Sequence, residues 1–159
     1  MKLNNIAKFI IAFGVTFAAA AAGSLATFSQ IPTWYVNLNK TSLTPPNWVF
    51  GPVWTTLYIL MAIAMYLVWT AKTKKPEAKQ GSILFVEQLF FNAAWSIVFF
   101  GFHQILFAFV IIIVLWLTIL ANIIWFFKVS KSAGYLMLPY IAWVSFASIL
   151  NFAVYLANR

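Results

Sequence analysis

Long runs of apolar residues dominate the chain, separated by short segments that contain proline, glycine or lysine. A helix that crosses the hydrocarbon core of a bilayer needs about 20 mostly apolar residues. Barrel strands are only about ten residues long and alternate in polarity, which these runs do not. Five runs are long enough, at about residues 6–28, 48–70, 82–101, 105–127 and 134–157. The pattern predicts an all-α fold, with residues 1–159 forming a single integral membrane bundle of five transmembrane helices.

The first run has two features of a secretory signal peptide, because Lys2 and Lys8 precede it and alanines crowd its end. Its apolar part exceeds the about 7 to 15 residues of a signal core. We therefore expect it to be retained as the first spanning helix.

Small residues spaced four apart form rows along this first helix and allow another helix to approach closely. We expect packing within the chain, rather than dimerisation, to use these rows. They contain Gly14, Ala18 and Ala22, with Ala19 and Gly23 beside them.

Composition agrees with a membrane location. Apolar residues make up 64% of the chain and charged residues only 8%, whereas soluble domains usually contain about 25% charged residues. The net charge of +8 lies in short loops beside apolar runs, which is typical of membrane orientation and not of nucleic-acid binding. The chain has no cysteine, so disulfides and thiolate metal sites are excluded.

The basic residues divide unevenly between the two sides of the membrane. Five spans place successive loops on alternate sides, and only Lys40 and Arg159 fall opposite the N-terminus. The positive-inside rule then predicts a cytoplasmic N-terminus and an external C-terminus, with the loop at about residues 29–47 on the outer face. The eight residues on the N-terminal side are Lys2, Lys8, Lys72, Lys74, Lys75, Lys79, Lys128 and Lys131.

Few side chains can support acid–base or metal chemistry. Glu77 and Glu87 are the only acidic side chains, and His103 is the only imidazole. A metal site with several ligands or a Ser–His–Asp triad cannot be assembled from them, so we predict no metal and no required cofactor. Glu87 fits either an intramembrane functional residue or the membrane interface. His103 fits an interfacial turn or a haem ligand.

Aromatic residues are abundant, with eight Trp, six Tyr and 17 Phe. Those near the ends of the runs fit an interfacial belt. Because an amide exposed to lipid is costly, Asn92 should face protein or a cavity. Such stripes occur in packed cores and in ligand cavities, and the proline-rich segment nearby favours a cavity. The deeper residues at helical spacing are Trp54 and Tyr58, then Asn92, Trp95 and Phe99, then Trp143, Ala147 and Leu150.

Three motifs, in order and each on its expected helix, resemble one known family over nearly the whole chain. It is the tryptophan-rich sensory protein or translocator protein family, also called the peripheral benzodiazepine receptor family. The motifs are Trp34-Tyr35, Lys40, Pro45-Pro46 and Phe50 to Tyr58, then Asn92 to Ser96 with Phe99-Phe100, and then Pro139-Tyr140 to Trp143 with Leu150-Asn151.

The resemblance implies a homodimeric five-helix bundle in a bacterial plasma membrane, with a cavity for porphyrins such as protoporphyrin IX and for benzodiazepines or isoquinoline carboxamides. Aromatic walls suit a planar tetrapyrrole by stacking, and an amide can orient a carboxylate or carbonyl. Tyr35, Pro45 and Pro46 would form a lid. The implied ligand-binding residues are Tyr35, Pro45, Pro46, Phe50, Trp54, Asn92, Trp95, Trp143 and Ala147.

The resemblance leaves three functions open. The first is a membrane receptor or sensor for porphyrins. The second is an enzyme that degrades protoporphyrin IX in light, with Trp54 and Trp143 as the catalytic residues. The third is a small transporter of tetrapyrroles or other lipophilic molecules.

A loose sterol-binding pattern also occurs near the C-terminus, at Leu150, Tyr155 and Arg159. Animal members of the family carry a tyrosine where this chain has Phe152. We therefore do not expect sterol binding.

Overall fold

A computed structural model describes residues 4–72 and 75–159, so Lys2 and Lys74 lie outside the described residues. All regular structure in these two segments is helical. This confirms the all-α fold. Five helical stretches are long and apolar enough to cross a membrane, namely Asn5–Thr27, Asn47–Thr70, Pro76–Gly101, Ile105–Val129 and Lys131–Ala157.

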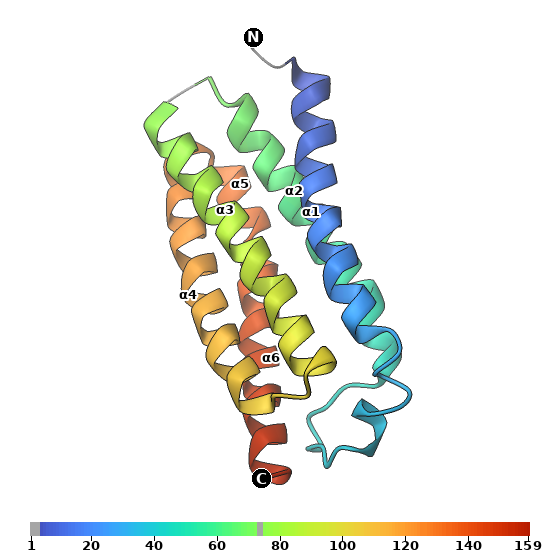
Figure 1. The fold of residues 1–159 in the computed structure, drawn as a ribbon. Helices are drawn as coiled ribbons and strands as arrows, with labels where there is room; N and C mark the ends of the chain where they lie inside the picture. Colours follow the sequence, from blue (N-terminus) through green and yellow to red (C-terminus); the bar gives the residue numbers. More distant parts are fainter. Residues whose placement is uncertain (1–3, 73–74) are drawn as a thin grey trace.

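The helices run up and down in one bundle (Figure 1). α3 (Lys75–Ser96) packs most extensively against α4 (Ile105–Val129), while α1 (Asn5–Thr27) contacts both α2 (Phe50–Thr70) and α3. α6 (Leu138–Ala157) packs mainly on α4. The α1–α2 loop, the turn between α3 and α4 and the C-terminus share one end of the bundle.

The third and fifth spans begin earlier than the apolar runs predict, and both α3 and α6 contain a proline in the first turn. α3 starts at Lys75, about two turns before residue 82, and contains Pro76 in its first turn. The fifth span starts with the short helix α5 (Lys131–Leu136), capped by Ser130, and α6 then begins with Pro139 in its first turn. A proline is tolerated there because first-turn N–H groups have no partner within the helix.

The end of α3 widens into a π-helical turn, η3 (Ile97–Gly101). The backbone N–H of Phe102 donates to the carbonyl of Ile97, five residues earlier, at 3.0 Å. The consecutive residues Phe99 and Phe100 are both buried here. Both rings therefore project into the bundle, at the end that carries the α1–α2 loop.

Small residues on α1 have two different surroundings. Gly23 is buried against α3, since a Cβ added there would lie 3.2 Å from Ser96 Oγ, and Ala19 is partly buried against the core. These positions confirm the expected packing within the chain. The row of Gly14, Ala18 and Ala22 is exposed instead, so that expectation is wrong for this row.

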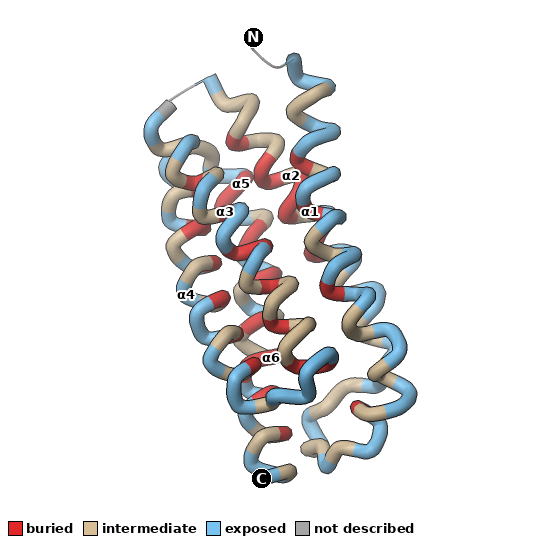
Figure 2. The backbone as a smooth tube through the Cα atoms, viewed as in Figure 1, coloured by how far each residue is buried: buried red, intermediate tan, exposed pale blue. Residues whose placement is uncertain are grey.

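Figure 2 shows buried positions on the inward faces of the helices and exposed positions on their outward faces. Many exposed side chains are large and apolar, including Ile10, Phe90 and Leu117. An apolar outer surface of this kind is suited to lipid.

Basic residues gather at the end of the bundle where α1 begins, as the apolar runs predict. Lys8 donates from its ammonium group to the Trp69 carbonyl at 2.8 Å, which ties α1 to the end of α2. Lys128 lies over the ring of Trp125, 3.8 Å from its centroid. The described lysines at this end are Lys8, Lys72, Lys75, Lys79, Lys128 and Lys131.

The approach of α5 to α4 generates a stability prediction. A Cβ at Gly134 would lie 2.5 Å from two ring carbons of Phe127, whereas a Cβ at Gly14 would meet open space within the described part of the chain. We expect Gly134→Ala to destabilise the protein by about 1–3 kcal/mol through overpacking. Thermal unfolding in detergent, followed by circular dichroism, should show a lower midpoint. Gly14→Ala is the matched control and should show an equal or higher midpoint, because alanine favours helix. Equal midpoints for the two variants would contradict this packing.

Candidate ligand-binding cavity

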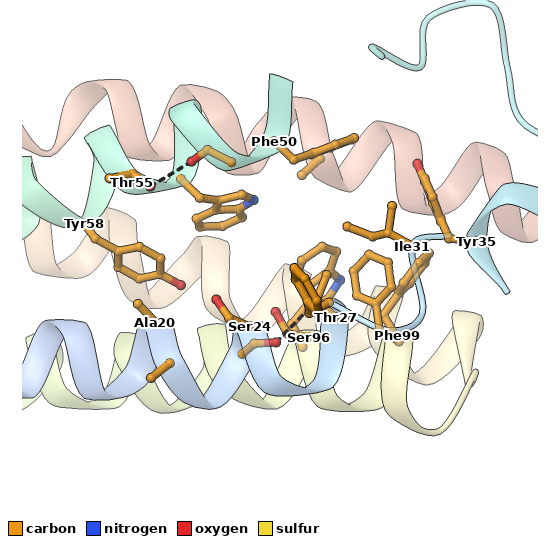
Figure 3. A pocket seen from close by; sticks show the side chains of 18 of the residues that line it. Ala20, Ser24, Thr27, Ile31, Tyr35, Phe50, Thr55, Tyr58, Ser96 and Phe99 are labelled. Atoms are coloured by element: carbon orange, nitrogen blue, oxygen red, sulfur yellow. Dashed lines mark hydrogen bonds between the residues drawn. The ribbon is translucent and has the colours of Figure 1, made fainter. Parts of the chain in front are cut away.

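A cavity of about 510 Å³ lies between α1, α2, α3 and α6, in the half of the bundle that carries the α1–α2 loop (Figure 3). Ligand pockets in proteins usually measure about 300–1,000 Å³. Most of the wall is apolar. The aromatic residues that line it are Phe17, Phe28, Tyr35, Phe50, Trp54, Tyr58, Trp95, Phe99 and Phe100.

A buried hydrogen-bonded triad fixes one end of the cavity. The Tyr58 hydroxyl donates to Asn92 Oδ1 at 2.6 Å, and Asn92 Nδ2 donates to the Tyr140 hydroxyl at 3.0 Å. The three residues belong to α2, α3 and α6, and all are buried. The Asn92 amide therefore ties three helices together.

Tryptophans form the central wall. The Trp95 indole N–H donates to Asn151 Oδ1 at 3.0 Å, and Asn151 Nδ2 donates to the Ile105 carbonyl at 3.0 Å. Trp54 lies beside Trp95, with ring centroids 6.4 Å apart and planes inclined by 30°. Tyr58 is 5.7 Å from Trp54 at the same inclination. Together these rings present an aromatic surface of the kind on which a flat ligand stacks.

The α1–α2 loop covers the end of the cavity with Tyr35, which is buried against Phe50 and Phe100 at centroid distances of 6.4 and 5.6 Å. The Lys40 ammonium group donates to the Tyr35 carbonyl at 2.7 Å and to the carbonyls of Val36 and Leu38 at 3.0 Å. Burial raises the pKa of the Tyr35 phenol. The loop thus presents a neutral aromatic ring to the cavity.

Contacts with the end of α6 and with the α3–α4 turn fasten this loop to the rest of the bundle. The backbone N–H of Asn39 donates to Asn158 Oδ1 at 3.0 Å, just after α6. Trp34 stacks on His103, with centroids 4.1 Å apart, and His103 Nε2 lies 3.0 Å from Gln30 Oε1. His103 also has a φ of 59°, an uncommon backbone conformation for a residue with a side chain.

The cavity has a mouth between α1 and α2. Every lining residue from α3 and α6 is buried or half-buried. The exposed lining residues lie on or just after α1 or on α2, so this mouth opens sideways, toward lipid. The clearest examples are Ala21, Ser24 and Phe28 on one side and Gly51 and Thr55 on the other.

The structure brings together five of the nine binding residues implied by the family resemblance, and these are Tyr35, Phe50, Trp54, Trp95 and Ala147. Asn92 lies behind Tyr58 and does not line the cavity. Pro45 is half-buried and Pro46 is exposed in the loop, and neither lines the cavity.

Trp143 lies in a separate hollow between α2 and α6, together with Pro52, Pro139 and Phe146. Its ring centroid is 6.1 Å from that of Phe50, which lines the main cavity. The buried Trp143 indole N–H has no hydrogen-bond partner within the described parts of the chain.

Glu87 and His103, for each of which the sequence allows two roles, lie away from the cavity. Glu87 is exposed on the outward face of α3. His103 lies in the turn between α3 and α4, where it contacts the α1–α2 loop. Neither residue lines the cavity.

Sequence reasoning did not assign the wall contributed by α1. This wall contains Ala20, Gly23, Ser24 and Thr27. Small residues in helical rows are the only signal in this segment, and they indicate close helix packing as well as they indicate a cavity wall. Asn151 also lines the cavity, and its place in a family motif was the available signal.

The cavity is suited to binding more than to acid–base chemistry. Its lining, among the residues that the structure describes, contains no acidic side chain and no histidine. Among residues 4–72 and 75–159, no group of three or more His, Cys, Asp or Glu side chains lies close enough to hold a metal ion. An aromatic ligand with a few hydrogen-bond acceptors fits such a lining.

Comparison with known proteins identifies the same family as the sequence motifs. The model of the TspO/MBR family matches residues 12–156. The chain is 40% identical to the "Tryptophan-rich protein TspO" of Archaeoglobus fulgidus, over 97% of this chain and 99% of that protein. It is 36% identical to the "Tryptophan-rich sensory protein" of Cereibacter sphaeroides, over 87% and 86%. It is also 36% identical to the human "Translocator protein", over 95% and 92%. With its motifs, its five apolar helices and these full-length matches, the chain belongs to the TspO/MBR family of integral membrane proteins.

Proposed function

We propose that this protein is a membrane receptor or sensor that binds porphyrins, such as protoporphyrin IX, in its aromatic cavity. The observation that carries this proposal is the wall formed by Trp54, Trp95 and Tyr58, which has centroid distances suited to stacking. The same apolar cavity is suited to benzodiazepines and isoquinoline carboxamides. A relative named "Tryptophan-rich sensory protein" supports a sensory role.

The ligand would reach the cavity from the bilayer. The mouth between α1 and α2 opens on the lipid-facing side of the bundle, and its exposed residues include Ala21 and Thr55. A hydrophobic porphyrin partitions into lipid, so a lateral mouth suits it better than an aqueous channel.

A homodimer and a bacterial plasma membrane remain predictions of the family resemblance. The exposed row of Gly14, Ala18 and Ala22 on α1 is free to approach another helix closely. Transport of tetrapyrroles also remains an alternative, supported by the name "Translocator protein" of the human relative.

Binding can be tested in the dark by titrating the purified protein with protoporphyrin IX and following tryptophan emission. We expect saturable quenching in the micromolar range or tighter. Trp54→Leu removes part of the stacking wall and should weaken binding by about 1 kcal/mol, or roughly fivefold. Trp48→Leu is the control, because Trp48 is 74% exposed and does not line the cavity. Emission that stays unchanged while circular dichroism shows an intact fold would count decisively against a porphyrin receptor.

Light-dependent degradation of the bound porphyrin is a second candidate function, favoured by the place of Trp54 on the cavity wall. Trp143 lies outside this wall. In light and oxygen, at saturating porphyrin, we expect Trp54→Phe to lose most degradation while it still binds, because phenylalanine is much harder to oxidise. Trp143→Phe should retain more of the rate. Absorption spectra recorded in light and in the dark measure the rate, and parallel losses of rate and affinity in Trp54→Phe would show that Trp54 is only a wall.

Orientation can be tested by labelling single cysteines, since the chain has none of its own. The uneven distribution of lysine and arginine predicts a cytoplasmic N-terminus. Ser42 in the α1–α2 loop and Lys79 near the start of α3 are both exposed and lie at opposite ends of the bundle. An impermeant maleimide should label Ser42→Cys in intact cells and Lys79→Cys only after lysis. The reverse pattern would show that the predicted orientation is wrong.

A further inference from the structure

Two serines line the cavity where α1 meets α3. Ser24 and Ser96 both line the cavity, and Figure 3 shows them on the same wall. Gly23 makes this arrangement possible, because the position of its missing Cβ lies 3.2 Å from Ser96 Oγ. A larger residue at position 23 would push α1, and Ser24 with it, away from α3.

Neither hydroxyl is used by the protein's own fold. Serine and threonine inside helices commonly donate to the carbonyl four residues earlier, as Thr16, Thr27 and Thr55 do here. Ser24 and Ser96 make no side-chain hydrogen bond to any residue that the structure describes. Ser24 is exposed at the mouth of the cavity and Ser96 is half-buried, so both hydroxyls are available as donors to a ligand.

Several other polar groups of the cavity are already engaged, although the Tyr35 hydroxyl and the Trp54 indole N–H also make no side-chain hydrogen bond to the residues that the structure describes. The Tyr58 hydroxyl donates to Asn92, and Asn151 uses both atoms of its amide, one with Trp95 and one with Ile105. Asn92, the residue that the family resemblance implies for orienting a ligand, also uses both amide atoms. A ligand that hydrogen-bonds to Asn92 or Asn151 would have to compete with these bonds.

We propose that Ser24 and Ser96 form the polar anchor of the cavity, donating hydrogen bonds to a carboxylate or carbonyl oxygen of a flat aromatic ligand. The inference rests on the porphyrin-binding function proposed above. Ser96 directly follows Trp95, so a ring on the tryptophan wall places its substituents beside the anchor. Ser24 lies one turn before the end of α1. A charged carboxylate there is near the membrane interface, where its cost is lower than at the bilayer centre.

Two porphyrins with the same type of ring test the anchor. Mesoporphyrin IX carries propionate side chains, and etioporphyrin carries only alkyl groups. We expect the double variant Ser24→Ala/Ser96→Ala to bind mesoporphyrin about tenfold more weakly than the unmodified protein, because charge-assisted hydrogen bonds are lost. Its affinity for etioporphyrin should be unchanged. Quenching of tryptophan emission in the dark measures both affinities.

Thr27→Val is the matched control, because its hydroxyl already donates to Gly23 on the same wall. It should leave both affinities unchanged. Equal affinities of the double variant and the unmodified protein for mesoporphyrin overturn the anchor while leaving porphyrin binding intact. An equal loss for both porphyrins also overturns it, since the serines would then only shape the wall. If the unmodified protein binds neither porphyrin, the proposed function fails, and the anchor fails with it.

Discussion

The cavity depends on a single buried amide. Asn92 accepts a hydrogen bond from Tyr58 of α2 and donates one to Tyr140 of α6, so three helices meet at one depth in the bundle. In hydrocarbon surroundings, leaving either amide atom unpaired is costly, and this cost fixes the helices relative to one another. The aromatic wall follows from this contact, because Trp54 lies one turn from Tyr58 on α2 and Trp95 lies one turn from Asn92 on α3.

The number and type of helices could be predicted from the sequence because bilayer thickness sets how long an apolar run must be. Their ends could not be placed as well. Pro76 lies between two predicted runs, yet it is in the first turn of α3, where a missing N–H costs nothing. Pro139 lies inside the fifth predicted run, yet it is in the first turn of a second helix, α6. The π-helical turn at Ile97–Gly101 has no local signal of its own, because its apolar residues fit an ordinary helix equally well.

Part of the cavity could also be predicted, because helical spacing places Trp54 with Tyr58 and Trp95 with Phe99 on one face of their helices. The rest depends on how each helix is rotated. Small residues surround much of α1, so spacing alone does not show that Gly23 faces α3 while Ala22 faces outward. On α6, Ala147 lines the cavity, whereas Trp143, one turn earlier, lies in a separate hollow behind Phe50 of α2. The rotation of a helix depends on the helix that packs against it, so the sequence of one helix alone does not predict it.

The polar groups of the bundle divide into those that hold the helices and those that remain free to bind. The Asn92 and Asn151 amides belong to the first class. Asn92 joins α3 to α2 and α6, and Asn151 joins α6 to α3 and α4. The free hydroxyls of Ser24 and Ser96 lie where α1 meets α3, and α1 buries the smallest share of its residues among the five spans. Weakly buried elements separate from a fold most easily. A ligand oxygen shared by Ser24 and Ser96 would therefore add a hydrogen-bonded link between α1 and α3, which otherwise join in the described part of the chain by packing at Gly23. Because α1 also forms one side of the mouth, that link would oppose the separation of α1 and hold the ligand in place.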